Sequence, residues 1–231
     1  MQDAGFRTTY LGGATLDFAG KGSFLRGNGY DLALGIDELP NATGHNWGMY
    51  DSDLFTNSKR LFDGLAEGTA PFMLTVLTLD THHPEGTPSP GCAPYLPDPA
   101  VMLSAVHCSD QLVGDFIAHI RASPVADNTV IAIVSDHLLI QGTVTDALET
   151  QDRKLTFFVL RPSAQGQERA GSATHFDIAP TLLEAVGFSN SQFAFGQSLL
   201  THDMGRAFER NLTKEDFLPF TVEALTAAKG G

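Results

Sequence analysis

Short apolar runs alternate along the chain with longer stretches in which apolar residues recur at helical spacing. The continuous apolar runs predict strands, at 6–11, 71–79, 128–134 and 155–161. The amphipathic stretches predict helices, at 53–67, 102–120 and 177–186, with a short helical turn at 23–26. This alternation predicts an α/β fold, with a mostly parallel sheet and helices on both of its faces.

The runs at 71–79 and 128–134 are apolar throughout, which is typical of strands buried on both faces. In sheets of this kind, ligands bind outside the carboxyl ends of the strands. The residues that follow each strand are therefore the candidates for a functional site.

Asp136 and His137 directly follow one of these predicted strands. A carboxylate oxygen and an imidazole nitrogen are both ligands for a divalent ion. Adjacent Asp and His are also common in turns, and spacing alone favours that plainer interpretation, because a metal site usually gathers ligands from several elements.

A second polar cluster, at 80–84, follows the neighbouring apolar strand. A histidine there, His82 or His83, could donate a hydrogen bond to a phosphoryl oxygen or exchange a proton with a leaving alkoxide. The alternative is that these histidines only cap the loop. Both interpretations remain open at this point.

Two further residues are candidates for substrate contact. Lys21 lies in a glycine-flanked loop where a flexible cation could reach a phosphate, although a lone lysine is more often a solvated surface residue. Trp47, the only tryptophan, could stack on the sugar or glycerol face of a substrate, or anchor its polar loop on the core. His175 and Asp177 are interpreted as structural, since polar groups there suit the start of the helix that follows.

Composition narrows the function classes. With 42% apolar and 18% charged residues, the chain is long enough to bury a core, so disorder is not expected. The formal net charge of −13 argues against a nucleic-acid partner. An acidic protein that handles phosphate needs local positive charge, which points to a bound metal.

Neither a membrane span nor a secretory signal is predicted, because the apolar runs are too short and residues 1–7 lack the pattern of a signal. The two cysteines, Cys92 and Cys108, flank a proline-rich loop and a predicted helix. Their spacing suits a loop-closing disulfide, but two free thiols are equally compatible with it.

A set of phrases in a fixed order resembles phosphoglycerol transferase I, the enzyme family that decorates osmoregulated periplasmic glucans. This family is related to lipoteichoic acid synthase within the alkaline phosphatase and sulfatase superfamily. The resemblance runs from residue 1 to about residue 200. It rests on the segments 11–21, 24–31, 46–51, 78–84, 105–109, 128–131 and 135–138.

The resemblance implies roles for the candidate residues. Asp136 and His137 would be two ligands of one divalent ion, Mn²⁺, and His82 would contact the phosphoglycerol group. Lys21 falls where the synthases place a substrate-binding arginine, and Lys offers a point charge in place of a bidentate fork. Relatives in the periplasm carry cysteines at the positions of Cys92 and Cys108, which favours the disulfide.

The resemblance also implies what this chain lacks. Residues 1–200 would be the C-terminal part of a sulfatase-like catalytic domain, without its N-terminal strands, and 201–231 a tail. The threonine nucleophile and an acidic metal ligand would precede this part, so the chain alone is expected to bind metal weakly and to be inactive. The parent enzyme would form a covalent phosphoglycerol-threonine intermediate.

In the parent, a donor derived from phosphatidylglycerol would pass its phosphoglycerol group to a glucan acceptor. This would occur at the periplasmic face of the inner membrane, with the membrane contacted only through the missing N-terminal part. Two alternatives remain: a sulfatase or phosphodiesterase of the same superfamily, and a catalytically inactive module that binds glucan or lipid headgroups.

Overall fold

The computed structural model describes residues 1–39, 41–96, 100–140, 142–162, 164, 166, 173–188 and 196–201. The chain divides into two units. One comprises Met1–Thr129 and Val134–Phe157, and the other comprises Val130–Ile133 and Phe158–Gly231. Nearly all of the predicted tail at 201–231 lies outside the described residues.

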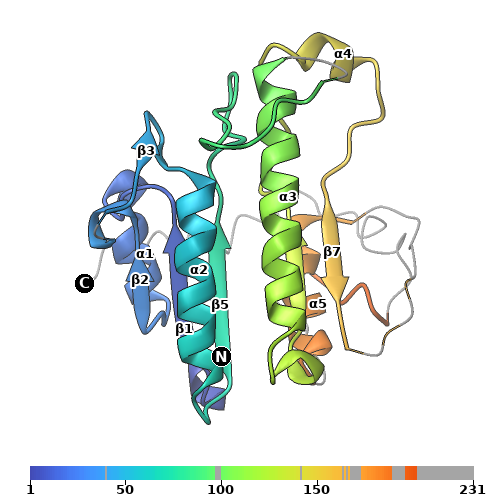
Figure 1. Cartoon of the computed structure of the whole chain (residues 1–231). Coiled ribbons are helices and arrows are strands. Elements are labelled where there is room, and N and C mark those ends of the chain that lie inside the picture. The colour runs from blue at the N-terminus through green and yellow to red at the C-terminus, as the bar shows by residue number, and fades with distance from the viewer. Residues whose placement is uncertain are drawn as a thin grey trace, which may run out of the picture. The chain divides into compact units, whose positions relative to one another are not determined.

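A parallel three-stranded sheet forms the centre of the first unit (Figure 1). Its middle strand is β1 (Arg7–Gly12), which pairs in parallel with β2 (Leu32–Leu34) on one side and β5 (Phe72–Leu77) on the other. The predicted α/β class with parallel strands is confirmed.

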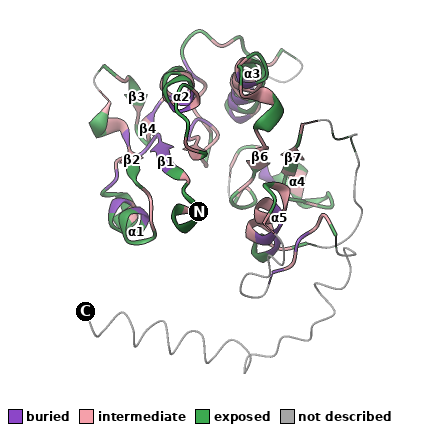
Figure 2. Cartoon of the chain, turned by 90° about the horizontal axis from the view of Figure 1, so that it is seen from below, coloured by how far each residue is buried: buried purple, intermediate pink, exposed green. Residues whose placement is uncertain are grey.

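The two faces of β1 are covered by different helices, because successive side chains of a strand point to opposite sides. Tyr10 packs with Leu16 and with Leu25 of α1 (Lys21–Gly27). On the other face, Leu11 packs with Met49 and with Leu54 of α2 (Asp51–Ala66). Figure 2 shows β1 between these two helices.

The long helix α3 (Val101–Arg121) packs beside α2 through aromatic rings. The Phe116 ring of α3 lies 5.6 Å from Phe55 and 6.3 Å from Phe62, both on α2. Phe62 also meets Phe72 of β5 edge-on at 5.8 Å. Burial of these large rings fixes α2 between the sheet and α3.

Several short elements occur where the sequence predicted only loops. The polar stretch after residue 41 contains a hairpin of β3 (Gly44–His45) and β4 (Gly48–Met49), which pair antiparallel. A short helix, α4, spans Thr145–Glu149. The single-turn 3₁₀ helices are η1 (Gln2–Ala4), η2 (Phe18–Gly20), η3 (Ile36–Glu38), η4 (Ala126–Asn128) and η5 (His175–Asp177).

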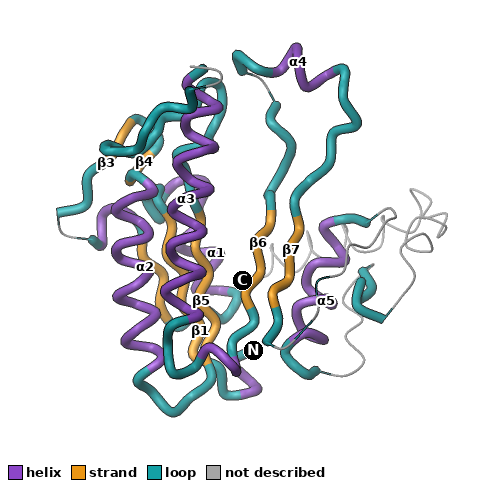
Figure 3. Tube along the Cα trace, turned by 45° about the vertical axis from the view of Figure 1, so that its right-hand side comes forward, coloured by secondary structure: helices purple, strands orange, loops and turns teal. Residues whose placement is uncertain are grey.

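The prediction that two strands are buried on both faces is wrong for this chain. Every side chain of β5 is only half-buried, because β5 lies at an edge of the described sheet. The residues of β6 (Ile131–Val134) alternate between half-buried and exposed. The described structure pairs β6 only with β7 (Phe157–Leu160), as Figure 3 shows, so an apolar strand here is not a fully covered one.

In the second unit, η5 leads directly into α5 (Ile178–Ala185). The buried Asp177 carboxylate accepts hydrogen bonds from the Thr174 amide at 2.8 Å, the Thr174 hydroxyl at 3.0 Å and the Gln197 amide at 2.9 Å. Asp177 therefore satisfies backbone donors at a helix start, in agreement with its structural interpretation.

Candidate active site

The loop that follows β5 is held by a compact set of backbone hydrogen bonds. The His82 amide donates to the Leu79 carbonyl at 2.8 Å, and the Gly86 amide donates to the His82 carbonyl at 3.0 Å. The Thr87 amide donates to the Asp80 carbonyl at 2.7 Å. These bonds fix the backbone on both sides of His82 at the carboxyl end of a parallel strand, where the sequence predicted chemistry.

The structure brings together two residues that the sequence offered as separate candidates. The rings of Trp47 and His82 stack with 3.9 Å between their centroids and 33° between their planes. The His83 ring stacks in turn on the His82 ring, with 4.5 Å between the two centroids. Trp47 keeps 41% of its surface exposed, so the stack is accessible to a ligand.

One nitrogen of His82 already has a partner. Its Nδ1 lies 2.7 Å from the His83 carbonyl oxygen, which can only accept a hydrogen bond. Nδ1 is therefore the protonated nitrogen of the neutral ring, and Nε2 is left for a ligand. In this state Nε2 accepts a proton, and after protonation it donates one.

Two buried carboxylates lie beneath this loop. Asp51, the first residue of α2, and Asp80 are both fully buried. The Asp51 amide donates to the Asp80 carboxylate at 3.1 Å, and the Asp51 carboxylate accepts from the Leu79 amide at 2.8 Å. Two hydrogen bonds of opposite direction thus join the start of α2 to the residues that follow β5.

Serine hydroxyls complete the bonding of both carboxylates. The Ser109 hydroxyl, from α3, donates to Asp51 at 2.8 Å. The Ser89 hydroxyl donates to Asp80, and its oxygen accepts from the Ser52 amide at 2.9 Å. Burial raises the pKa of the Asp51 carboxyl to about 6, and the nearby Asp80 charge adds to that shift. Burial likewise raises the pKa of Asp80, against the opposing effect of its hydrogen bonds.

His45 connects the carboxylates to the tryptophan. Its Nδ1 accepts a hydrogen bond from the Trp47 amide at 3.4 Å, so Nε2 carries the proton in the neutral ring. This Nε2 lies 3.4 Å from the Asp80 carboxylate, and only 6% of the His45 side chain is exposed. Since none of the described residues makes a well-directed hydrogen bond with Nε2, the contact with Asp80 is mainly electrostatic.

A disulfide joins the loop after β5 to α3. Cys92 and Cys108 have their Cα atoms 5.6 Å apart and are the only cysteines, so the chain has no free thiol. This is the pairing that the resemblance implied. Cys92 follows Ser89 closely and Cys108 precedes Ser109, so the disulfide lies beside both hydroxyls that bind the buried carboxylates.

Asp136 and His137 lie in an exposed loop, with 72% and 50% of their side chains accessible. The Asp136 Oδ2 and His137 Nε2 atoms are 3.5 Å apart. This spacing is close to that of two neighbouring ligands around one ion with bonds of about 2.1 Å. Across the described residues no group of three or more His, Cys, Asp or Glu side chains gathers to hold a metal. The pair therefore fits as part of a metal site and does not form a whole one.

The loop that carries this pair borders the His82 loop. A Cβ atom built on Gly142 would lie 2.2 Å from the Pro84 carbonyl oxygen, so only glycine fits where the two backbones meet. This contact brings the segment after Asp136 and His137 to the segment after His82. That the pair faces His82 across one ligand stays a prediction.

Lys21 is the first residue of α1, and its Nζ atom lies 5.8 Å from the centre of the Phe18 ring. Burial lowers the pKa of this lysine. No described contact joins it to the Trp47 and His82 stack, so its role in substrate binding stays a prediction.

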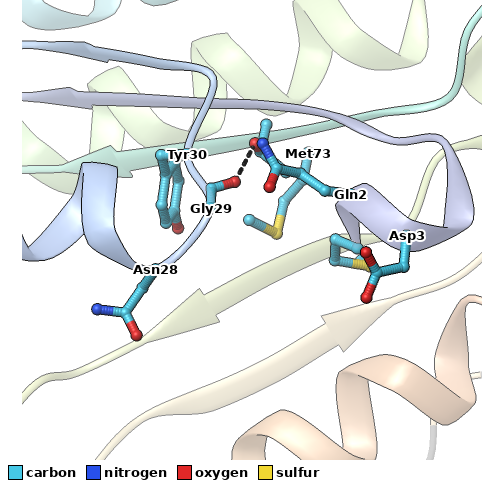
Figure 4. A pocket seen from close by; sticks show the side chains of 8 residues that line it. Gln2, Asp3, Asn28, Gly29, Tyr30 and Met73 are labelled. Atoms are coloured by element: carbon cyan, nitrogen blue, oxygen red, sulfur yellow. Dashed lines mark hydrogen bonds between the residues drawn. The ribbon is translucent and has the colours of Figure 1, made fainter.

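A cavity of about 260 Å³ lies at the opposite end of the sheet, where β1 and β5 begin (Figure 4). None of the candidate residues lines it. Its walls are formed by Met1, Gln2, Asp3, Thr8, Asn28, Gly29, Tyr30 and Met73.

None of the described helices is both long and apolar enough to span a bilayer.

The sulfatase family profile matches residues 1–188. The chain belongs to the sulfatase family. This membership accounts for the parallel sheet with candidate chemistry at the carboxyl ends of its strands.

Within the sulfatase family, the chain is similar to proteins named phosphoglycerol transferase I. It is 36% identical over 213 residues to one from Xanthomonas euvesicatoria pv. vesicatoria, a match that covers 88% of this chain and 30% of the relative. One from Salmonella paratyphi B is 35% identical over 200 residues, covering 82% and 26%. The chain thus spans about a third or less of the length of these relatives.

Solved structures show the same fold. The lipoteichoic acid synthase LtaP of Listeria monocytogenes aligns with a TM-score of 0.72 at 19% identity, over 88% of this chain and 54% of that one. A protein of the alkaline phosphatase superfamily from Vibrio parahaemolyticus aligns with a TM-score of 0.69 at 22% identity, over 93% and 50%. These likenesses show that the chain shares its fold with both solved proteins.

Proposed function

We propose that this chain contributes the substrate-contacting part of a phosphoglycerol transferase of the sulfatase family. The observation that carries the proposal is the stack of Trp47 on His82 at the carboxyl end of β5, in a chain similar to phosphoglycerol transferases along most of its length. The indole offers an apolar face to a glycerol backbone, and His82 Nε2 is available to a phosphoryl oxygen.

His82 is the proposed proton carrier. In the first half of the reaction, a threonine hydroxyl of the rest of the parent protein attacks phosphorus while a base of the parent takes its proton, and the bond to the lipid alcohol breaks. The protonated His82 gives its Nε2 proton to the departing oxygen, which leaves as a neutral alcohol. In the second half, a glucan hydroxyl attacks the phosphoglycerol-threonine and its proton passes to the neutral His82, while the base of the parent returns a proton to the threonine oxygen as that oxygen leaves.

Asp136 and His137 are the proposed ligands of a divalent ion, Mn²⁺, in the parent. Such an ion, when bound, neutralises charge on the phosphoryl oxygens. Lys21 adds a point charge for the same anionic group, in place of a bidentate arginine. Phosphatidylglycerol is the proposed source of the group and a periplasmic glucan its acceptor, at the periplasmic face of the inner membrane.

A hydrolase of the same family is the second candidate, because the family profile that matches residues 1–188 is that of the sulfatases. The two candidates differ in the ligand that the site prefers, since a transferase of this kind recognises the glycerol as well as the charge. A binding module without catalysis is distinguished from both by its indifference to the metal.

The test is a calorimetric binding titration of the purified 231-residue chain in the presence of Mn²⁺. We expect glycerol 1-phosphate to bind at least tenfold more tightly than inorganic sulfate. We expect His82→Ala to weaken that binding tenfold or more, while Asp63→Asn, a change on the exposed face of α2, leaves it unaltered. Equal affinity for sulfate would favour the hydrolase. Binding of glycerol 1-phosphate that His82→Ala and removal of Mn²⁺ both leave unchanged would contradict the proposal.

A further inference from the structure

Asp80 is linked to both partners of the aromatic stack by separate routes. Along the chain it precedes His82 by two residues, and its carbonyl oxygen anchors the same loop through the Thr87 amide. Across space its carboxylate holds His45 Nε2 at 3.4 Å, and His45 Nδ1 accepts from the Trp47 amide. Asp80 therefore contacts both the loop that carries His82 and the histidine that binds the Trp47 amide, although the two rings belong to different loops.

The position of this carboxylate is itself fixed. One oxygen accepts the Asp51 amide from α2 and faces His45 of β3, and the other accepts the Ser89 hydroxyl. A buried carboxylate is costly unless it is hydrogen-bonded, and Asp80 is both fully buried and fully engaged. Hydrophobic packing alone does not require an acid here, so the cost indicates a role in holding geometry.

The Asp51 carboxylate is also fully buried and hydrogen-bonded. Its carboxylate accepts from Leu79, the residue before Asp80, and from Ser109 of α3. The start of α2, the loop after β5 and α3 are thereby held at one point. The disulfide that links this loop to α3 lies next to the same point.

We propose that Asp80, supported by Asp51 and acting through His45, is a positioning residue that holds Trp47 against His82. It does not touch the substrate. Its part in phosphoglycerol transfer rests on the proposed function of His82, but the positioning itself is independent of any substrate. Without it, the hairpin that carries Trp47 and the loop that carries His82 would move separately.

The structure provides its own probe, because Trp47 is the only tryptophan of the chain. A stacked imidazole quenches indole fluorescence, so the emission of the purified chain reports how well the two rings are held together. His82→Ala defines the emission of the unstacked indole. We expect Asp80→Asn and His45→Gln to move the emission at least half of the way from the wild-type value to that reference.

Two controls separate positioning from general destabilisation. Asp63→Asn removes a carboxylate that pairs with His119 at 2.6 Å on the surface, and the emission should not change. Leu25→Ala weakens the core on the face of β1 covered by α1, and it should lower the melting temperature without altering the emission. His45→Gln keeps both buried carboxylates, so it serves as the test even where Asp80→Asn does not fold.

Wild-type emission in both Asp80→Asn and His45→Gln would overturn the proposal. So would an equal change in Leu25→Ala, which would reduce the effect to loss of stability. Because these measurements contain no ligand, their outcome is independent of the glycerol 1-phosphate titration. A failure of positioning is thus distinguishable from a failure of the proposed function.

Discussion

The ring of Trp47 lies 3.9 Å from the ring of His82, centroid to centroid, although the two residues come from different loops. His83 is further from the indole, at 6.4 Å. The two adjacent histidines are therefore not equivalent, and His82 is the one in direct contact with the tryptophan.

This difference predicts unequal effects of the two alanine substitutions on Trp47. His82→Ala removes the stacked ring, and it should raise the fluorescence intensity and the accessibility of the indole to acrylamide. His83→Ala should produce less than half of either change, since His82 still covers the indole. Steady-state emission and acrylamide quenching of the two variants measure this. Equal effects would contradict the stacking order.

The buried Asp51 predicts a pH-dependent contribution to stability. Its pKa of about 6 in the folded chain lies above the ordinary value of about 4, so the folded state binds the proton more tightly than the unfolded state. This contribution to the free energy of unfolding is fully present below about pH 4 and is lost as pH rises to about 6. Its size is about 3 kcal/mol, because one pKa unit corresponds to about 1.4 kcal/mol.

Asp51→Asn removes this contribution together with its coupling to Asp80, because asparagine mimics the protonated acid. Chemical denaturation at pH 4 and pH 7 should show that the variant loses less stability than the wild type over that interval. Asp31 titrates in the opposite sense, since hydrogen bonds from Thr8 and Gln2 lower its pKa, but it is the same in both proteins and cancels in the comparison. Parallel pH profiles for the two proteins would refute the account of Asp51.

The disulfide between Cys92 and Cys108 closes a loop with a sequence separation of 16. A crosslink of this length stabilises a folded chain by about 3 kcal/mol, chiefly by restricting the unfolded state. The double change of Cys92 and Cys108 to serine should therefore lower the free energy of unfolding by roughly that amount. Denaturation under non-reducing conditions provides the comparison, and a loss near zero would contradict it.

The elements with strong periodicity could be predicted from the sequence, and the contacts that build the site could not. The helices predicted at 53–67 and 102–120 match α2 and α3 closely, because an amphipathic pattern of that length is typical of a helix and of no other element. The hairpin of β3 and β4 is too short to leave such a pattern. It is defined instead by its antiparallel pairing and by the Met49 amide, which donates to the Gly13 carbonyl at 2.8 Å.

The carboxylate pair shows the same limit. The sequence places Asp51 before the helix predicted at 53–67 and Asp80 in the polar cluster at 80–84. Only the fold shows that Asp51 accepts the Leu79 amide and that Asp80 accepts the Asp51 amide. The local clue in the sequence was the position of polar residues after apolar strands, which made His82 a candidate; its role stays a prediction. Burial of β5 was overestimated, since an apolar run does not reveal whether a second layer covers it.

A cation held by Asp136 and His137 and the Nε2 atom of His82 are proposed to act together on one phosphoryl group. Mn²⁺ is paramagnetic and broadens the NMR signals of nuclei close to it, so adding it to the isotope-labelled 231-residue chain tests this proximity directly. We predict that the ring signals of His82 and Trp47 broaden along with those of His137, and that His137→Ala abolishes all three effects. Broadening confined to His137 and its sequence neighbours, with His82 unaffected, would contradict the claim.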